Sequence, residues 1–251
     1  MAKYVDKNAL ANNPATRVPI CICLDLSGSM NTVESGTFKE TGRQVHIDGK
    51  LYNMVEGGTT RLDELQKGLE HLFRSIKEDD MAVDAAEIAI VGFDEEAKVL
   101  LDFDHVENQS VPHLNADGDN TAIGEGVKLA LKMLEERKEL YKETGVQYFQ
   151  PWLVLMTDGE NNVNPQALAT ATQTASKLVN EKKLTIFPIG IGAEADMATL
   201  AKFSPKRPPL RLKGVKFSEF FEWLSQSISR TSVSKPGEEV TLPPVNGWGT
   251  L

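Results

Sequence analysis

Four short, almost entirely apolar runs recur along this chain of 251 residues, and segments with helical periodicity separate most of them. Strands that are apolar on both faces belong to sheets that are covered on both sides. Strands that alternate with helices form a mostly parallel sheet. The sequence therefore predicts a doubly wound α/β fold, with helices on both faces of a central sheet. The runs are residues 18–24 (VPICICL), 87–93 (EIAIVGF), 151–157 (PWLVLMT) and 184–189 (LTIFPI).

One pair of strands breaks the parallel pattern. Residues 87–93 and 97–103 are separated only by Asp94-Glu95-Glu96. A connection this short permits only antiparallel pairing. We therefore expect one antiparallel edge strand beside the otherwise parallel sheet.

The chain length allows a single domain of this kind, flanked by two tails. Residues 1–16 are polar without a sustained period, which predicts a loose amino-terminal arm before a domain that covers residues 17–232. Residues 233–251 are rich in Pro and Gly and are expected to lie extended on the surface. The expected anchors of this tail are Val240, Leu242, Val245 and Trp248.

An insertion over residues 31–60 separates the first strand from the first convincing helix. Its Asp48-Gly49 dipeptide is flanked by alternating residues, which predicts a β-hairpin over residues 43–55. Because the insertion follows directly on the first strand, the hairpin is expected to border the crevice at that strand's end. The alternative is a neutral surface embellishment.

The charge balance argues against two classes of partner. The chain carries 36 acidic and 27 basic residues, a formal charge of -9, which disfavours nucleic acid and anionic membrane surfaces. The one locally basic segment, residues 202–216, is broken by Pro and is expected to be a solvated rim. No apolar run approaches the roughly 18 residues of a membrane span, and no signal-peptide core is present, so a cytoplasmic location is expected.

The two cysteines fit a reducing compartment. Cys21 and Cys23 lie two positions apart on one predicted strand, which places their Cα atoms about 6.6 Å apart. This separation is near the upper limit for a disulfide. We expect both to be small core residues.

Polar residues follow the first apolar run in an alternating order. Asp25, Ser27 and Ser29 surround Gly28, which lets the backbone turn at the carboxyl end of the strand. Ligands bind at this end of open α/β sheets, and the three side chains offer hard oxygen ligands suited to a small divalent cation. Ser and Asp are also common in turns and helix caps, so this motif alone leaves both interpretations open.

Two further motifs favour the metal site. Asn120-Thr121-Ala122 opens a predicted helix, and Thr157-Asp158-Gly159 closes the third apolar run. Together with the first motif they resemble the metal-ion-dependent adhesion site of von Willebrand factor A domains, whose fold is Rossmann-like. The resemblance implies one divalent cation, Mg²⁺ or alternatively Mn²⁺ or Ca²⁺. The implied ligands are Asp25, Ser27, Ser29, Thr121 and Asp158.

In this family most of the ligands are neutral hydroxyls, so the ion keeps much of its positive character. The resemblance therefore implies that a free position on the ion captures an Asp or Glu side chain of a protein partner. One departure concerns Asp117-Gly118-Asp119, where the family often has a lead-in of small residues. Asp119 either adds charge near the ion or caps the helix, and capping is the favoured interpretation.

The carboxyl-terminal part narrows the resemblance. Residues 220–227 (FFEWLSQS), followed by Pro236-Gly237 and Leu242-Pro243-Pro244, resemble bacterial A-domain proteins associated with tellurium resistance. This similarity implies an intracellular partner-binding role in a stress-response system.

Other activities find less support in the sequence. Residues 190–195 match G-x-G-x-x-A, but prolines interrupt the helix that a dinucleotide site needs, so a tight turn without nucleotide binding is expected. The alternative function is a metal-assisted hydrolase that uses the same site. Such an enzyme would add an acid or base near the bound water. The sequence identifies none, so we expect no enzymatic activity.

Overall fold

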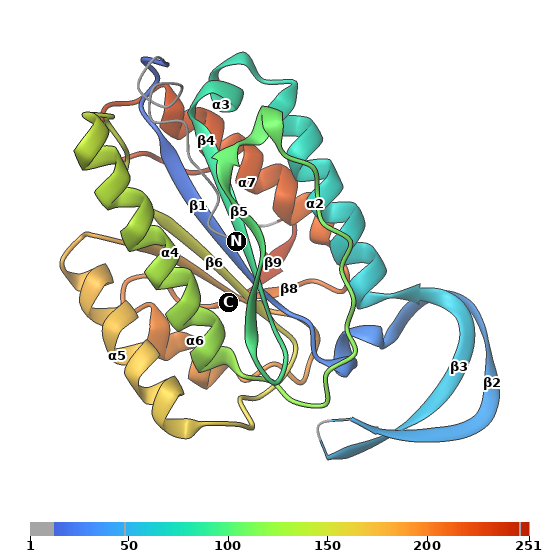
Figure 1. Ribbon diagram of the computed structural model, residues 1–251. Helices are drawn as coiled ribbons and strands as arrows, with labels where there is room; N and C mark the ends of the chain where they lie inside the picture. Colours follow the sequence, from blue (N-terminus) through green and yellow to red (C-terminus); the bar gives the residue numbers. More distant parts are fainter. Residues whose placement is uncertain (1–12, 48, 246, 251) are drawn as a thin grey trace.

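The computed structural model describes residues 13–47, 49–245 and 247–250, so most of the expected amino-terminal arm lies outside the described residues. A seven-stranded sheet forms the centre of the molecule, in the order β5-β4-β1-β6-β7-β8-β9 (Figure 1). The five inner strands are parallel, and β5 and β9 run antiparallel at the two edges. The strands are β1 (Val18–Asp25), β4 (Ala86–Phe93), β5 (Ala97–His105), β6 (Trp152–Thr157), β7 (Thr185–Gly190), β8 (Leu210–Leu212) and β9 (Gly249–Thr250).

Helices cover both faces of this sheet (Figure 1), as the sequence predicts. One face carries α2 (Arg61–Lys77), α3 (Asp80–Ala85) and α7 (Phe217–Ser232). The other carries α4 (Ile123–Thr144), α5 (Pro165–Asn180) and α6 (Met197–Phe203).

Alternate residues of β1 serve the two cores. Ile20 and Ile22 pack on the side of α2 and α7, whereas Cys21 and Cys23 pack on the side of α4. Both cysteines are free thiols, fully buried as expected. The uninterrupted apolar character of the strand thus reflects burial from both sides.

The insertion forms a long two-stranded ribbon of β2 (Val33–Ile47) and β3 (Lys50–Thr60), which projects from the sheet and curves (Figure 1). It is longer than the predicted hairpin over residues 43–55. The register shifts at three places: between Val33 and Ser35, between Ser35 and Phe38, and between Glu40 and Gln44. Each shift breaks the period of two, so the sequence pattern revealed only the regular end of the ribbon.

The ribbon leads directly into α2. The hydroxyl of Thr60 accepts a hydrogen bond from the backbone N–H of Asp63, and the Asp63 carboxylate accepts one from the N–H of Thr60. This reciprocal cap satisfies two free N–H groups at the helix start. It also fixes Arg61 as the first residue of the helix.

The carboxyl-terminal tail packs into the core at Trp248, whereas the sequence predicted an extended segment on the surface. Trp248 is 2% exposed and lies against the rings of Phe220 and Trp223, with ring centroids 4.9 and 5.2 Å away. The indole N–H of Trp223 donates to the carbonyl of Pro243 at 2.7 Å. Beyond Trp248 the chain adds β9 to the sheet, a pairing that the sequence analysis did not anticipate.

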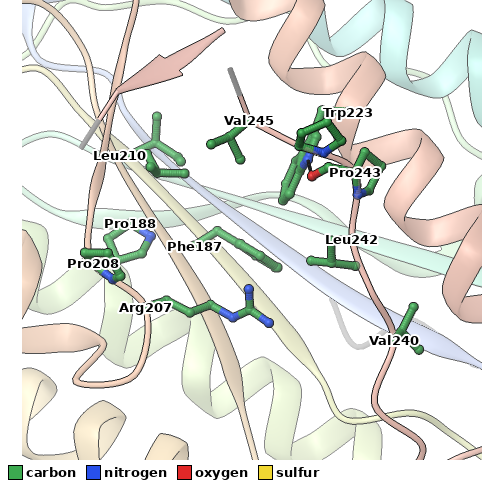
Figure 2. A pocket seen from close by; sticks show the side chains of 12 residues that line it. Phe187, Pro188, Arg207, Pro208, Leu210, Trp223, Val240, Leu242, Pro243 and Val245 are labelled. Carbon is green, nitrogen blue, oxygen red and sulfur yellow. Dashed lines mark hydrogen bonds between the residues drawn. The ribbon is translucent and has the colours of Figure 1, made fainter. Parts of the chain in front are cut away.

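A pocket of about 480 Å³ lies between the tail and the edge of β7 and β8 (Figure 2). Phe187 and Trp223 line it, and Leu242 and Pro243 form the wall on the side of the tail. The guanidinium of Arg207 lies 5.2 Å from the ring centroid of Phe187. This pocket shares no lining residue with the crevice at the carboxyl ends of β1 and β6.

The amino ends of the strands hold a buried ionic cluster. The Glu87 carboxylate accepts hydrogen bonds from Arg137 Nε at 2.6 Å and Tyr141 Oη at 2.5 Å. Arg17 Nε lies 3.2 Å from its other oxygen, and the side chains of Arg17 and Glu87 are fully buried. Within the described segments, no helix is both long and apolar enough to cross a membrane.

Candidate metal centre

The three predicted motifs meet at one edge of the sheet. Asp25 ends β1, and Asp158 follows β6, which is the parallel neighbour of β1. The chain turns from β1 toward β4 on one side and later returns to β6 on the other side. The site therefore lies at the topological switch point, where open α/β sheets bind ligands.

Asp25 is fully buried and held on both oxygens. Its Oδ1 accepts hydrogen bonds from the backbone N–H of Ser27 at 2.9 Å and from the Ser27 hydroxyl at 2.7 Å. Its Oδ2 accepts one from the Thr157 hydroxyl at 2.5 Å. Thr157, the last residue of β6, thus joins the two strand ends.

The two serine hydroxyls continue this network. The Oγ atoms of Ser27 and Ser29 lie 2.9 Å apart, and the Ser29 hydroxyl donates to Asp158 Oδ1 at 2.7 Å. Adjacent oxygens around an octahedral Mg²⁺, each about 2.1 Å from the ion, are about 3.0 Å apart. The serine spacing therefore fits two neighbouring ligands of one small cation.

Thr121 contributes a hydroxyl that stands alone. Its side chain is fully buried, and Oγ1 has no hydrogen-bond partner among the residues that the structure describes. A Cβ placed on Gly159 would lie 3.3 Å from this oxygen and 4.0 Å from Asp25 Oδ2. A buried polar atom without a partner costs free energy unless something binds it. The absence of a side chain at Gly159 leaves space beside it.

The helix after Thr121 begins without the predicted cap. The first residue of α4 is Ile123, and its N-cap Ala122 has no side-chain hydrogen bond. Asp119 is exposed, and its backbone N–H donates to Glu95 Oε1. The favoured interpretation of Asp119 as a cap was wrong, because the chain between Asp119 and Ile123 is not helical. The Thr121 backbone N–H instead donates to Asn162 Oδ1 at 2.8 Å.

The donor set is built on hydroxyls. Among the described residues, no three His, Cys, Asp or Glu side chains are grouped as a metal site. The five predicted residues supply three hydroxyls and two carboxylates, all oxygen donors of the kind that hard cations prefer. Their chemistry and the free Thr121 hydroxyl fit a divalent ion.

Burial changes the acidity of both carboxyl groups. Burial, with a contribution from the neighbouring Asp158, raises the pKa of Asp25 to about 7. Burial also raises the pKa of Asp158, against the opposing effect of hydrogen bonds from Ser29 and Arg61. A cation would favour the ionised forms, so metal binding here would release protons.

Arg61 belongs to this site, although the sequence analysis did not identify it. Its Nη1 lies 2.9 Å from Asp158 Oδ2, and its Nε lies 2.6 Å from Glu34 Oε1 on β2. Its Nη2 lies 3.5 Å from Glu194 Oε2, in the loop after β7. A cation at the first position of a helix opposes the helix dipole. This unfavourable placement was the available signal that Arg61 has another role.

The ribbon closes one side of the site. A crevice of about 140 Å³ is lined by Ser29, Arg61 and Asp158 on the body of the molecule and by Lys50 and Tyr52 on β3. The prediction that the inserted hairpin borders the crevice at the end of the first strand is therefore confirmed in position.

Known structures share the fold. Proximal thread matrix protein 1 from the mussel byssus, solved with a zinc-occupied MIDAS motif, is 16% identical with a TM-score of 0.51. The PilB minor pilin from Streptococcus sanguinis is 15% identical with a TM-score of 0.57, and the pilus adhesin SpaC from Lactobacillus rhamnosus GG is 13% identical with a TM-score of 0.60.

The matches cover 86%, 88% and 86% of this chain, in the same order. They cover 48%, 64% and 31% of those chains, so this chain spans less than two thirds of each. No curated protein matches it. The family described as von Willebrand factor type A domain matches residues 20–213, more than half of the chain. With the fold and the match in agreement, the chain belongs to the von Willebrand factor type A domain family.

Proposed function

We propose that this protein is a metal-dependent protein-binding module. The observation that carries the proposal is the continuous hydrogen-bonded series Asp25, Ser27, Ser29 and Asp158, with the unpartnered Thr121 hydroxyl beside it. This arrangement is buried yet adjoins an open crevice at the switch point of the sheet.

Ser27, Ser29 and Thr121 would hold the ion through their hydroxyls. Asp25 and Asp158 would bind it directly or through water. Mg²⁺ is the proposed ion, with Mn²⁺ and Ca²⁺ as alternatives, and the zinc-occupied MIDAS motif of the mussel protein supports a divalent cation in this fold. A bound ion supplies an electrophilic position for an oxygen ligand. An Asp or Glu side chain of a partner would occupy it.

Two of the structurally similar proteins support a binding role. One is a pilus adhesin and another a minor pilin. The similarity of residues 220–227 to tellurium-resistance-associated proteins supports a bacterial stress-response setting in the cytoplasm. We further propose that the ribbon helps select the partner, because Lys50 and Tyr52 line the crevice.

We propose no intrinsic turnover for this site. The described residues that line the crevice include no histidine, the side chain that most often acts as a general base. A panel of phosphate-ester, carboxyl-ester and nucleotide substrates tests this point. Metal-dependent hydrolysis that copurifies with the protein and is lost in Asp158→Ala would establish the hydrolase alternative.

The central experiment separates metal binding from partner capture. Calorimetric titration with Mg²⁺ and Mn²⁺ should show one site in the wild type and none in Asp25→Ala/Asp158→Ala. The matched control is Asp80→Ala/Asp104→Ala, which removes two exposed carboxylates. Immobilised wild type should retain a host protein in Mg²⁺ and release it in chelator. Equal metal affinity in both double variants would refute the site.

A further inference from the structure

We infer that Arg61 is a second anchor for the captured carboxylate, which would bind one oxygen to the metal and present the other to the guanidinium. Glu194 would then occupy the Nη2 atom of Arg61 in the absence of a partner, and the carboxylate of the partner would displace it. This inference rests on the proposed function and adds the residue of this chain that would bind the second oxygen of the captured carboxylate.

Arg61 is adjacent to the place where the metal would bind. The two oxygens of Asp158 are divided between Ser29, whose hydroxyl donates to Oδ1, and Arg61, which contacts Oδ2. Ser29 is a proposed metal ligand, so the guanidinium lies one carboxylate away from the ion. Arg61 is only 7% exposed, yet it lines the crevice beside Ser29. Part of the Arg61 side chain therefore borders the space that a ligand would enter.

The three ion pairs of Arg61 are unequal. The contacts with Glu34 at 2.6 Å and Asp158 at 2.9 Å have the length of strong charge-assisted hydrogen bonds. The contact between Nη2 and Glu194 is 3.5 Å, at the limit of a hydrogen bond. The Glu194 side chain is 54% exposed, whereas those of Glu34 and Asp158 are 28% and 0% exposed. Glu194 is thus the partner that an incoming carboxylate can replace at least cost.

The guanidinium suits this task chemically. Its planar donors match the two oxygens of a carboxylate, and it stays charged at every physiological pH. Lys50 also lines the crevice and adds a second positive charge to it, beside the acidic Glu160 and Glu194. A neutral amide could also bind the metal through its oxygen, but it would gain little attraction from the positive charges of Arg61 and Lys50. The crevice should therefore discriminate between the two by charge.

The test uses acetate as the probe, with acetamide as its neutral counterpart. The protein is saturated with Mn²⁺, and binding is followed by the loss of water-proton relaxation enhancement at constant ionic strength. Free Mn²⁺ is measured separately by electron paramagnetic resonance, so metal affinity and carboxylate affinity are independent readouts. Circular dichroism confirms that each variant is folded.

We expect Arg61→Gln to bind Mn²⁺ as well as the wild type or better, because a neighbouring positive charge is removed. Its acetate affinity should fall by roughly tenfold, the usual effect of losing one charge-assisted hydrogen bond. Glu194→Gln should act in the opposite direction and strengthen acetate binding several-fold. Arg61→Lys should lie between wild type and Arg61→Gln. The matched control is Arg74→Gln, which removes an exposed arginine from the same helix.

Opposite signs for Arg61→Gln and Glu194→Gln distinguish an anchor from a structural ion pair. Weaker acetate binding in both variants would mean that the cluster only shapes the crevice, which overturns the inference. Unchanged acetate affinity in Arg61→Gln overturns it as well and leaves the proposed function intact. If the wild type fails to bind Mn²⁺, the proposed function and this inference fall together.

Discussion

Ile47, at the end of β2, packs against Gly28 in the turn that carries the candidate metal ligands. A Cβ added to Gly28 would lie 3.0 Å from Ile47 Cγ2 and 3.2 Å from the carbonyl oxygen of Gly118. The Gly28 N–H already donates to that carbonyl at 2.7 Å. Gly28 is therefore held between Ile47 and the carbonyl of Gly118. Because it has no side chain, the end of β2 can pack closely on the turn.

Gly28→Ala should loosen the ribbon without unfolding the domain. The added methyl pushes Ile47 away, and overpacking of this kind costs about 1–3 kcal/mol. Trypsin should then cleave faster at Arg43 and Lys50, which are exposed on the ribbon. Adding Ile47→Ala should slow cleavage again. Gly247→Ala is the matched control, since nothing lies within 4 Å of a Cβ there. Equal cleavage of Gly28→Ala and wild type would show that the contact does not hold the ribbon.

Thr121→Val should separate metal affinity from stability. Valine has nearly the shape of threonine, and the lost hydroxyl has no partner among the described residues. We therefore expect metal-free stability to stay within about 0.5 kcal/mol of wild type, whereas Mg²⁺ affinity falls on the order of tenfold or more. Urea denaturation in chelator and calorimetric Mg²⁺ titration measure the two quantities.

The matched variant is Thr157→Val, because the Thr157 hydroxyl donates to Asp25. It should lose about 1–3 kcal/mol of metal-free stability, since a hydrogen bond to a buried carboxyl group is removed. A large stability loss in Thr121→Val would mean that its hydroxyl has a structural role.

The raised pKa of Asp25, about 7 in the metal-free protein, predicts an unusual pH dependence. The folded state binds this proton more tightly than the unfolded chain, whose Asp pKa is about 3.9. Its contribution to stability is thus complete below about pH 4 and is lost as the pH rises through about 7. Asp25→Asn cannot ionise, so it should become more stable relative to wild type across this window.

Urea denaturation in chelator at about pH 5 and about pH 8 measures the change. Saturating Mg²⁺ at the higher pH should stabilise the wild type more than Asp25→Asn, because the ion needs the ionised carboxylate. If Asp25→Asn instead lost stability relative to wild type as the pH rose, the pKa of Asp25 would not be raised.

Glu87→Gln should be the most destabilising of these substitutions. It removes the carboxylate that neutralises two buried guanidinium groups, those of Arg17 and Arg137. Breaking a buried ion pair from one side costs about 3–5 kcal/mol. Chemical denaturation gives the loss directly. Glu139→Gln, in an exposed pair with Lys142, should leave stability unchanged. Comparable losses in the two variants would contradict the role given to the cluster.

Much of the fold was determined by local patterns in the sequence. The strand that ends at Asp25 was predictable because burial on both faces leaves an uninterrupted apolar run. The start of α5 at Pro165 was predictable because proline suits the first helical turn. The antiparallel turn at Asp94 to Glu96 followed from its length alone. Each of these signals lies within a few residues of the feature that it reports.

The predicted ligands were recognisable for a related reason. Asp25, Ser27 and Ser29 lie close together in sequence, and Thr121 and Asp158 each begin or end an element that the pattern marks. The parallel sheet then brings these elements to one edge without further information, because the carboxyl ends of neighbouring strands coincide.

Only the tertiary structure decided what surrounds the site. Arg61 and Asp158 are 97 positions apart, and Arg61 and Glu194 are 133 apart. No local period records such contacts, since they depend on how helix, ribbon and loop converge. The same holds for Ile47 against Gly28 and for β9 beside β8. The sequence by itself determined the sheet and the candidate oxygen ligands at its edge. Folding in three dimensions decided the charges and walls of the crevice, because side-chain contacts between distant elements arise only when the core has packed.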